Sequence, residues 1–327
     1  MRRFLAARIL LMGFVLFMIA TLMFGMFALL PGDPTASFVE EGLSRKALER
    51  QRELWGLDAP MHVQYLRYLG NVATLEFGVS FRAQVPVREV LVEKFLNSIA
   101  MMLPALVLIM IGGTVFGAYL GWRRGSAVEK TAVLTGLAVE SMPSFFAGIV
   151  MLMLFSYGLG WLPSAGMGPS GGSGSFLATV LSSDFPRYAA LPVLTLAVRG
   201  VNGPMLLMRT SMIEIRGSDF LMLLEAKGVS ELRVVLHAVR NAILPMITYF
   251  GVLIGTLFQG QVLLETVFGW PGIGRAVVDA LAARDFPVLQ GAFFLTAIVV
   301  VGMNLVVDIL YGYLDPRVRV GGDEARA

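Results

Sequence analysis

Six long apolar stretches constrain this chain more than any other feature of its sequence. Each holds roughly 20 residues or more, about the length that an α-helix needs to cross a ~30 Å hydrocarbon core. Only 15% of the residues are charged, whereas soluble domains average about 25%. The sequence therefore predicts an all-α integral membrane protein with six transmembrane helices. The predicted spans are Ile9–Leu30, Ser98–Leu120, Thr131–Leu159, Ala189–Met208, Ala242–Leu264 and Val288–Tyr311.

The remaining composition excludes several other classes of protein. The net charge is +3, but the basic residues lie at the boundaries of the predicted spans and form no basic face for nucleic acid. The absence of cysteine excludes disulfides and thiolate metal sites. Two distant histidines, His62 and His237, make a histidine-rich metal site improbable. We expect this chain to bind no cofactor.

The first apolar stretch follows Met1-Arg2-Arg3 and could be a signal peptide. Its apolar run is longer than the 7–15 residues of a signal-peptide core, and no small-x-small cleavage site follows it. Pro31 and Pro34 come next and stop the helix, because proline cannot continue it. We predict a retained helix.

The placement of lysine and arginine predicts the orientation. If the N-terminus is cytoplasmic, the inner loops hold most of the basic residues, while the short outer loops hold only Arg187, Arg275 and Arg284. Both termini are then cytoplasmic. The predicted segments are 1–30 (N-terminal end and first helix), 31–97 (extracytoplasmic cap), 98–314 (five-helix core, including a cytoplasmic segment at 210–244) and 315–327 (cytoplasmic tail).

The cap is predicted to be a small packing domain outside the membrane. Ser44–Leu57 can form a polar helix. In His62–Asn71, the residues Val63, Leu66 and Leu69 recur every three positions, which predicts a helix that packs through this face.

The segment 210–244, between the fourth and fifth predicted spans, predicts a short helix. Gly217-Ser218-Asp219 breaks one helix and offers caps for the next. Phe220–Lys227 is amphipathic, with Phe220, Leu221 and Leu224 able to face a partner. Gly228 suits the left-handed position that ends a helix. From these residues alone, an interfacial loop that touches only lipid remains an equal alternative.

Several motifs in this chain occur in the order of a known family. Glu225-Ala226-Lys227-Gly228, followed by Arg240-Asn241-Ala242-Ile243-Leu244-Pro245, resembles the cytoplasmic "EAA" loop of binding-protein-dependent ABC-transporter permeases, specifically the dipeptide/oligopeptide/nickel importer family. The further similar motifs are Leu30-Pro31-Gly32-Asp33-Pro34, Gln64-Tyr65-Leu66-Arg67, Phe77-Gly78-Val79-Ser80, Met142-Pro143-Ser144-Phe145, Gly160-Trp161-Leu162-Pro163, Glu265-Thr266-Val267-Phe268-Gly269-Trp270-Pro271-Gly272-Ile273-Gly274, Arg284-Asp285-Phe286-Pro287-Val288 and Asp315-Pro316-Arg317.

The resemblance implies a permease subunit without catalytic activity in a bacterial or archaeal cytoplasmic (inner) membrane. It implies a path formed with a second homologous permease for di- or oligopeptides or a related small solute. The implied partners also include two ATPase subunits and an extracytoplasmic substrate-binding protein. The chain contains no G-x-x-x-x-G-K-[ST] phosphate loop, so ATP would be hydrolysed by the partner subunits.

The resemblance also implies two contact surfaces. The short helix would bind a cleft of the ATPase subunit as a coupling helix, through Phe220, Leu224, Glu225, Ala226, Lys227 and Gly228. The outer loop with Phe268 and Trp270, together with the cap, would form the surface where the binding protein docks. Without the resemblance, Trp270 is equally suited to anchor the chain at the membrane interface.

Two charged residues fall near the middle of predicted spans. Glu140 and Arg199 lie on helices that are neighbours in sequence, and charges at this depth cost roughly 2.5–3.5 kcal/mol each on insertion scales. They could form a structural ion pair or contact a charged terminus of the substrate. Our hypothesis is that they line or brace the translocation path.

Two other classes of membrane protein remain as alternatives. A self-contained secondary transporter or channel predicts ion-coupling carboxylates in several spans, or internal repeats, and neither is evident. An intramembrane enzyme requires a Ser/His or carboxylate pair at one depth, but His62 and His237 are assigned to opposite sides. Nothing in the sequence selects among dipeptides, oligopeptides, nickel chelates, glutathione and sugars as the solute.

Overall fold

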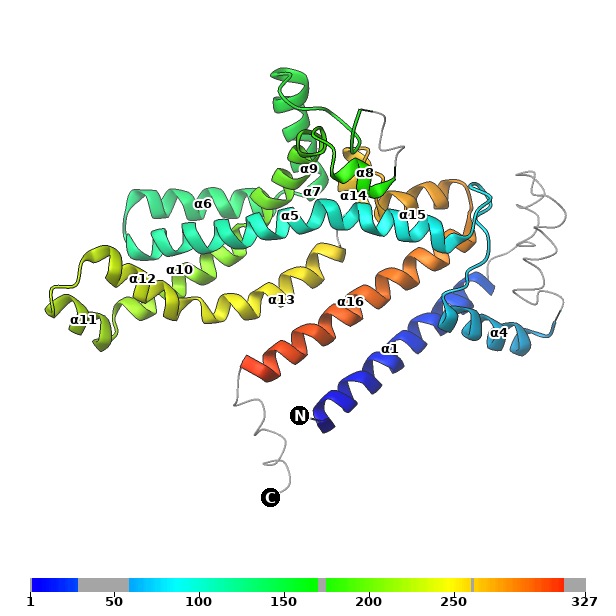
Figure 1. The fold of residues 1–327 in the computed structure, drawn as a ribbon, viewed down its shortest axis with the longest axis horizontal. Coiled ribbons are helices and arrows are strands. Elements are labelled where there is room, and N and C mark those ends of the chain that lie inside the picture. Colours follow the sequence, from blue (N-terminus) through cyan, green and yellow to red (C-terminus); the bar gives the residue numbers. More distant parts are fainter. Residues whose placement is uncertain (1, 29–58, 170–174, 260–261, 315–327) are drawn as a thin grey trace. The chain divides into compact units, whose positions relative to one another are not determined.

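The computed structural model describes residues 2–28, 59–169, 175–259 and 262–314 (Figure 1). Within these ranges the chain is helical, and strand pairing is limited to one isolated bridge between Val79 and Pro86. The predicted polar helix Ser44–Leu57 lies outside the described residues, as does the tail 315–327.

Three of the described helices are long and apolar enough to cross a membrane without a break. They are α1 (Arg2–Ala28), α5 (Val87–Trp122) and α16 (Phe286–Leu314). Three bent pairs pass the same test of length and composition when each pair is taken as one span. They are α6 (Ala127–Ser141) with α7 (Ser144–Met151) and the π-helix η1 (Leu152–Gly158), α9 (Phe185–Gly200) with α10 (Asn202–Arg216), and α12 (Glu231–Ala242) with α13 (Leu244–Gln259). An integral membrane protein with several apolar helices is therefore confirmed.

The sharpest of these bends is the 106° turn between α6 and α7. Pro143 causes it, because its ring disfavours helical geometry in the preceding residue and its nitrogen carries no hydrogen. Met142 is accordingly extended (φ −70°, ψ 137°). Pro143 then occupies the N-cap position of α7.

The helices group into two compact units, which are described separately. The first joins Met1–Ser98 to Gly269–Ile309, and the second centres on Ile99–Phe268. The first unit therefore contains most of α16, which we had assigned to the permease core.

In the first unit, α1 and α16 lie side by side and run in opposite directions (Figure 1). An ion pair of 3.1 Å between Arg8 Nη1 and Asp308 Oδ2 joins the start of α1 to the end of α16. The core of this unit also includes residues of α4 (Met61–Thr74), of the beginning of α5 and of α15 (Ile273–Ala282).

The helix predicted at His62–Asn71 is present as α4, and of its predicted packing residues Leu69 lies half-buried against the core of this unit. Tyr68 and Val72 are buried, and the hydroxyl of Tyr65 is 2.7 Å from that of Thr21 on α1. Leu66 is 65% exposed, so the prediction that it belongs to the packing face was wrong. A spacing of three residues drifts around a helix of 3.6 residues per turn, whereas the spacing of Tyr65, Tyr68 and Val72 stays on one face.

In the second unit, three glycines let α5 approach α10 closely. A Cβ atom on Gly113, Gly117 or Gly121 would lie 2.5–2.6 Å from its nearest atom on α10. Glycines four residues apart form a flat strip on a helix, and such strips allow neighbouring membrane helices to pack with their backbones close together.

The short helix α11 (Asp219–Ala226) connects α10 to α12 at one end of this unit (Figure 1). Leu221 of α11 is buried in a cluster with Met212, Val234 and Ala238. Two further short helices, α8 (Phe176–Val180) and α14 (Val262–Val267), complete the described elements.

Candidate functional site

The segment predicted to carry a short helix does so, and its boundaries follow from local sequence. Ser218 occupies the N-cap position of α11 in an extended conformation, but its side chain makes no capping hydrogen bond. Gly228 follows the helix with φ +71°, a conformation that glycine adopts without strain. The next helix, α12, begins after Ser230, whose side chain makes no capping hydrogen bond.

One face of α11 is packed and the other is exposed. Leu221 is buried and Leu224 packs half-buried against the same cluster, so the prediction that Leu221 faces a partner was wrong. Phe220 is 40% exposed. The other exposed residues from 222 to 228 are Met222, Leu223, Glu225, Ala226, Lys227 and Gly228. The structure thus adds Met222 and Leu223 to the candidate contact surface and leaves Leu224 only partly accessible.

Both ends of the α11 segment are tied to one residue at the end of α5. The indole nitrogen of Trp122 donates a 3.0 Å hydrogen bond to Glu231, the first residue of α12. The guanidinium of Arg216, the last residue of α10, donates to the carbonyl oxygen of Trp122. The same guanidinium lies over the Trp122 ring, 4.8 Å from its centroid, a distance at which a cation is attracted to an indole.

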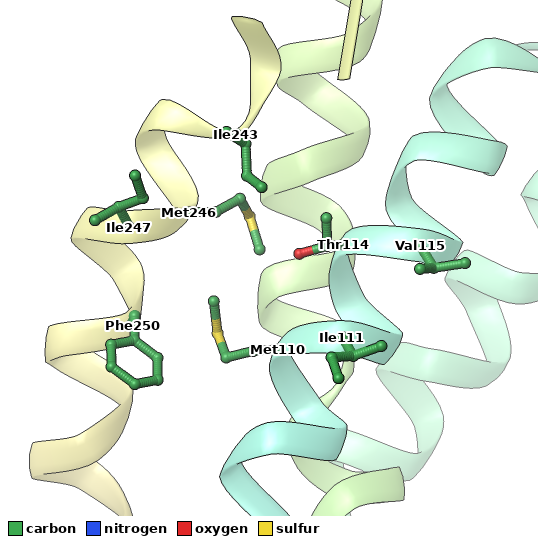
Figure 2. A pocket seen from close by; sticks show the side chains of 8 residues that line it. All are labelled: Met110, Ile111, Thr114, Val115, Ile243, Met246, Ile247 and Phe250. Carbon is green, nitrogen blue, oxygen red and sulfur yellow. The ribbon is translucent and has the colours of Figure 1, made fainter. Parts of the chain in front are cut away.

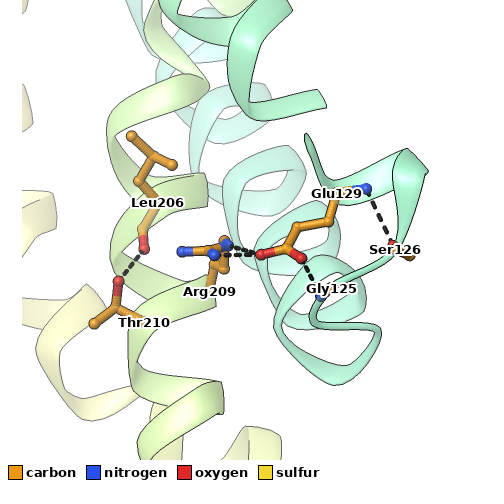
Figure 3. A network of polar contacts seen from close by, with 6 residues as sticks. All are labelled: Gly125, Ser126, Glu129, Leu206, Arg209 and Thr210. Atoms are coloured by element: carbon orange, nitrogen blue, oxygen red, sulfur yellow. Dashed lines mark hydrogen bonds and ion pairs between the residues drawn. The ribbon is translucent and has the colours of Figure 1, made fainter. Parts of the chain in front are cut away.

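A buried carboxylate joins the turn between α5 and α6 to α10 (Figure 3). Glu129 Oε1 accepts hydrogen bonds from Nε of Arg209, at 2.6 Å, and from Nη2 of the same side chain. Glu129 Oε2 accepts from the backbone N–H of Gly125 at 2.5 Å. The Glu129 side chain is 5% exposed. This site was missed from the sequence, although Ser126 and Glu129 have the spacing of a helix-capping box.

Glu140 and Arg199 do not pair with each other in the structure. Arg199 Nε donates to the carbonyl oxygen of Met142 at 2.9 Å, at the bend between α6 and α7. Glu140 Oε2 accepts from Asn202 Nδ2 at 2.5 Å, and Asn202 begins α10 just after its bend with α9. Both charged residues therefore bind uncharged polar groups near helix breaks, and the ion-pair interpretation was wrong.

Phe268 and Trp270 are both buried, with exposed fractions of 2% and 0%. The indole nitrogen of Trp270 donates to the carbonyl oxygen of Asn97 at 2.8 Å, and Asn97 Nδ2 donates to the carbonyl oxygen of Pro271 at 3.0 Å. These side chains hold the loop in place, so the prediction that they themselves contact a docking protein is corrected. The suggestion that Trp270 anchors the chain at the membrane interface is corrected for the same reason.

Two of the sequence motifs meet in the first unit through a buried carboxylate. Asp285 Oδ2 accepts from Ser80 Oγ at 2.6 Å and from the backbone N–H of Arg82 at 3.3 Å. Asp285 Oδ1 also accepts from the N–H of Val288 in the first turn of α16 at 3.4 Å. Asp285 therefore caps the N-terminus of α16 and holds the segment after α4 beside it. Sequence reasoning missed this role.

The second unit contains an apolar pocket of about 430 Å³ between α5 and α13 (Figure 2). Its lining offers one side-chain hydroxyl, that of Thr114, among otherwise apolar groups. Such a lining has too few polar groups to orient a polar solute. The lining residues are Met110, Ile111, Thr114, Val115, Ile243, Met246, Ile247 and Phe250.

Comparison with known proteins identifies the family. The family described as "Binding-protein-dependent transport system inner membrane component" matches residues 113–320. The model of its N-terminal region matches residues 1–102.

Several curated relatives match along almost their full length. A di/tripeptide transport system permease protein of Pseudomonas aeruginosa is 36% identical over 338 residues, which cover 98% of this chain and 99% of the relative. A dipeptide transport system permease protein of Escherichia coli K12 is 33% identical, covering 92% and 94%. A glutathione transport system permease protein of Salmonella typhi is also 33% identical, covering 93% and 94%. This chain therefore belongs to the family of binding-protein-dependent transport system inner membrane components, the permeases of ABC importers.

Proposed function

We propose that this chain is one of two homologous permease subunits of an ABC importer. ATP is hydrolysed on two separate ATPase subunits, and this chain itself catalyses no reaction. An extracytoplasmic binding protein delivers the solute to a path between the permeases. The observation that carries this proposal is the family match along the chain together with α11, whose exposed face lies on a helix anchored at both ends.

The exposed face of α11 is suited to contact an ATPase subunit. A short helix can transmit movement only if it is rigidly held, and the contacts of Trp122 with Arg216 and Glu231 hold both flanking helices. We assign the contact to Phe220, Glu225, Ala226, Lys227 and Gly228, with Leu224 at its edge. A loop that touches only lipid would not need this anchoring.

The solute class is proposed from the relatives. Those described above are named for dipeptides, di/tripeptides and glutathione, and glutathione is itself a small peptide. We therefore propose di- or oligopeptides or a closely related small solute for this chain.

We propose six spans with both termini cytoplasmic. The three continuous helices and three bent pairs supply six candidates. The ion pair between Arg8 and Asp308 joins the start of α1 to the end of α16, which supports a placement of these two helix ends on the same side of the membrane.

We propose that Glu140 and Arg199 line the translocation path. Each lies at a helix break and binds a group of the neighbouring helix, so each can brace the path and also meet a polar solute. Replacing either residue separately with glutamine is expected to impair peptide uptake by proteoliposomes that contain the assembled transporter. Undiminished uptake by both variants would remove these residues from the path.

The ATPase contact is tested with Phe220→Ala. The tagged chain, expressed in its native host and purified in mild detergent, is expected to bring an ATPase subunit with it. Because exposed aromatic residues often dominate interfaces, the variant should recover about tenfold less ATPase. Leu181→Ala is the matched control. Leu181 is also an exposed apolar residue, 81% accessible, but it follows α8 and is not part of the exposed face of α11.

This experiment also separates the proposal from the alternative class. If the wild-type chain brings no ATPase and drives uptake alone in liposomes without nucleotide, it is a self-contained transporter. Equal ATPase recovery with Phe220→Ala and with the Leu181 control would remove Phe220 from the contact.

A further inference from the structure

We propose that Glu129 and Arg209 are positioning residues that make α6 move together with α10 and α11. With Trp122, Arg216 and Glu231 they form what we call the brace. The inference rests on the proposed function of α11, because it concerns how movement of that helix reaches the membrane-embedded part of the chain.

The brace attaches both ends of the α11 segment to the end of α5. Trp122 contacts the residue that ends α10 and the residue that begins α12. The segment 217–230 thus leaves and returns at the same point of α5. Displacement of α11 therefore moves the end of α5 with it, since neither flanking helix can shift without breaking a contact to Trp122.

The pair of Glu129 and Arg209 continues this connection to α6. Glu129 lies in the first turn of α6, and its backbone N–H donates to the side chain of the N-cap residue Ser126 at 3.2 Å. Two nitrogens of the Arg209 guanidinium bind Glu129 Oε1, while Glu129 Oε2 accepts from the backbone N–H of Gly125. Because both carboxylate oxygens are bound, the carboxylate is fixed in orientation as well as in distance. A buried ion pair is weak evidence for stability, because apolar residues often serve equally well. Its directional geometry is what a mechanical connection needs.

A second contact holds the same two helices near their other ends. Glu140, close to the end of α6, accepts from Asn202 at the start of α10. Between the two contacts, Gly136 lies so close to Asn202 that a side chain there would collide with its amide oxygen. The 15-residue α6 is about 22 Å long. Joined at both ends, α6 and α10 must carry movement from α11 to the bend at Met142 and Pro143.

Because this chain has no native cysteine, spin labels can be attached to it at chosen positions before it is assembled with its partners. Labels are placed at Asp219→Cys on α11 and Thr131→Cys on α6, both exposed positions, in the complete transporter complex. The distance between the two labels is measured by pulsed electron paramagnetic resonance, first without nucleotide and then with ATP plus vanadate. We expect one narrow distribution, unchanged between the two states, because the labelled helices move as one body.

Glu129→Gln is expected to broaden this distribution and to make its mean differ between the two states, while ATP hydrolysis persists because α11 is intact. Peptide transported per ATP hydrolysed should fall by about tenfold, within the range found for changes that weaken coupling between sites. Asp279→Asn is the matched control, since it makes the same chemical change in the exposed pair of Arg275 and Asp279.

The proposal is overturned if the wild-type distance already changes with nucleotide, or if Glu129→Gln keeps one narrow distribution in both states. If that variant fails to assemble, Glu129→Asp keeps the charge and shortens its reach by one methylene, and the same measurements apply. Should no ATPase bind the wild-type chain, the proposed function fails. The brace is then still tested, because Glu129→Gln should broaden the distribution without nucleotide.

Discussion

Replacing Gly117 with alanine is expected to destabilise the protein, although alanine favours helices more than glycine does. A Cβ atom at this position would lie 2.5 Å from the carbonyl oxygen of Met205 and 2.7 Å from Cβ of Met208. The oxygen belongs to the backbone of α10, so it cannot move aside by changing a rotamer. The helices α5 and α10 must separate instead, and overpacking of this kind costs about 1–3 kcal/mol or more.

The same substitution at Gly13 provides the control for Gly117→Ala. Gly13 lies within α1, and no atom outside its own helix lies within 4 Å of a Cβ built there. Gly13→Ala should therefore be neutral or stabilising by up to about 1 kcal/mol. The fraction of protein that stays monodisperse after heating in detergent is measured by size-exclusion chromatography. Equal thermal stability of the two variants would contradict the close approach of α5 and α10.

Trp270→Ala is expected to cause a loss of about 3–5 kcal/mol in the free energy of unfolding, the usual range for a buried tryptophan. The side chain is fully buried and donates a hydrogen bond to Asn97. Its removal leaves a cavity and deletes the hydrogen bond to the Asn97 carbonyl oxygen, and each loss is destabilising. The expected result is a large drop in the midpoint of thermal or denaturant unfolding.

Two further variants separate burial of the ring from its hydrogen bond. Trp270→Phe keeps most of the apolar volume and removes the donor, so it should cost about 1–3 kcal/mol. Trp161→Ala makes the full truncation at a tryptophan that is 62% exposed, and it should cost less than Trp270→Ala. If Trp161→Ala were as harmful as Trp270→Ala, the buried position of Trp270 would be contradicted.

The apolar regions could be predicted from sequence because membrane crossing imposes a length and a composition on each segment. The bends inside three of them could not be located by hydropathy alone. Met142 and Pro143 lie inside the predicted span Thr131–Leu159, and an average of hydropathy over a window of residues does not detect a proline that breaks the helix. The number of spans accordingly remains a prediction.

The candidate site was predictable where local chemistry determines it. The end of α11 follows from Gly228, whose conformational preference acts within a few residues. Which faces are packed depends on residues far away in sequence. The burial of Leu221 against α12, and of Trp270 against Asn97, therefore required the structure.

The polar pairs were the hardest features to predict. Glu140 and Arg199 could be recognised as charged residues at membrane depth, but their partners turned out to be a side-chain amide and a backbone carbonyl. Glu129 was overlooked because a glutamate in the first turn of a helix has an ordinary explanation in the helix dipole. Its connection to Arg209, 80 residues later, leaves no local signal.

The bend at Met142 and Pro143 has a consequence for solvation. Where a helix breaks, carbonyl oxygens lose their intrahelical partners, and hydrocarbon cannot replace them. Arg199 satisfies one of these oxygens with a charged donor. A polar position is thereby built into an otherwise apolar stretch of the chain. Water can be retained at this position without a continuous aqueous channel.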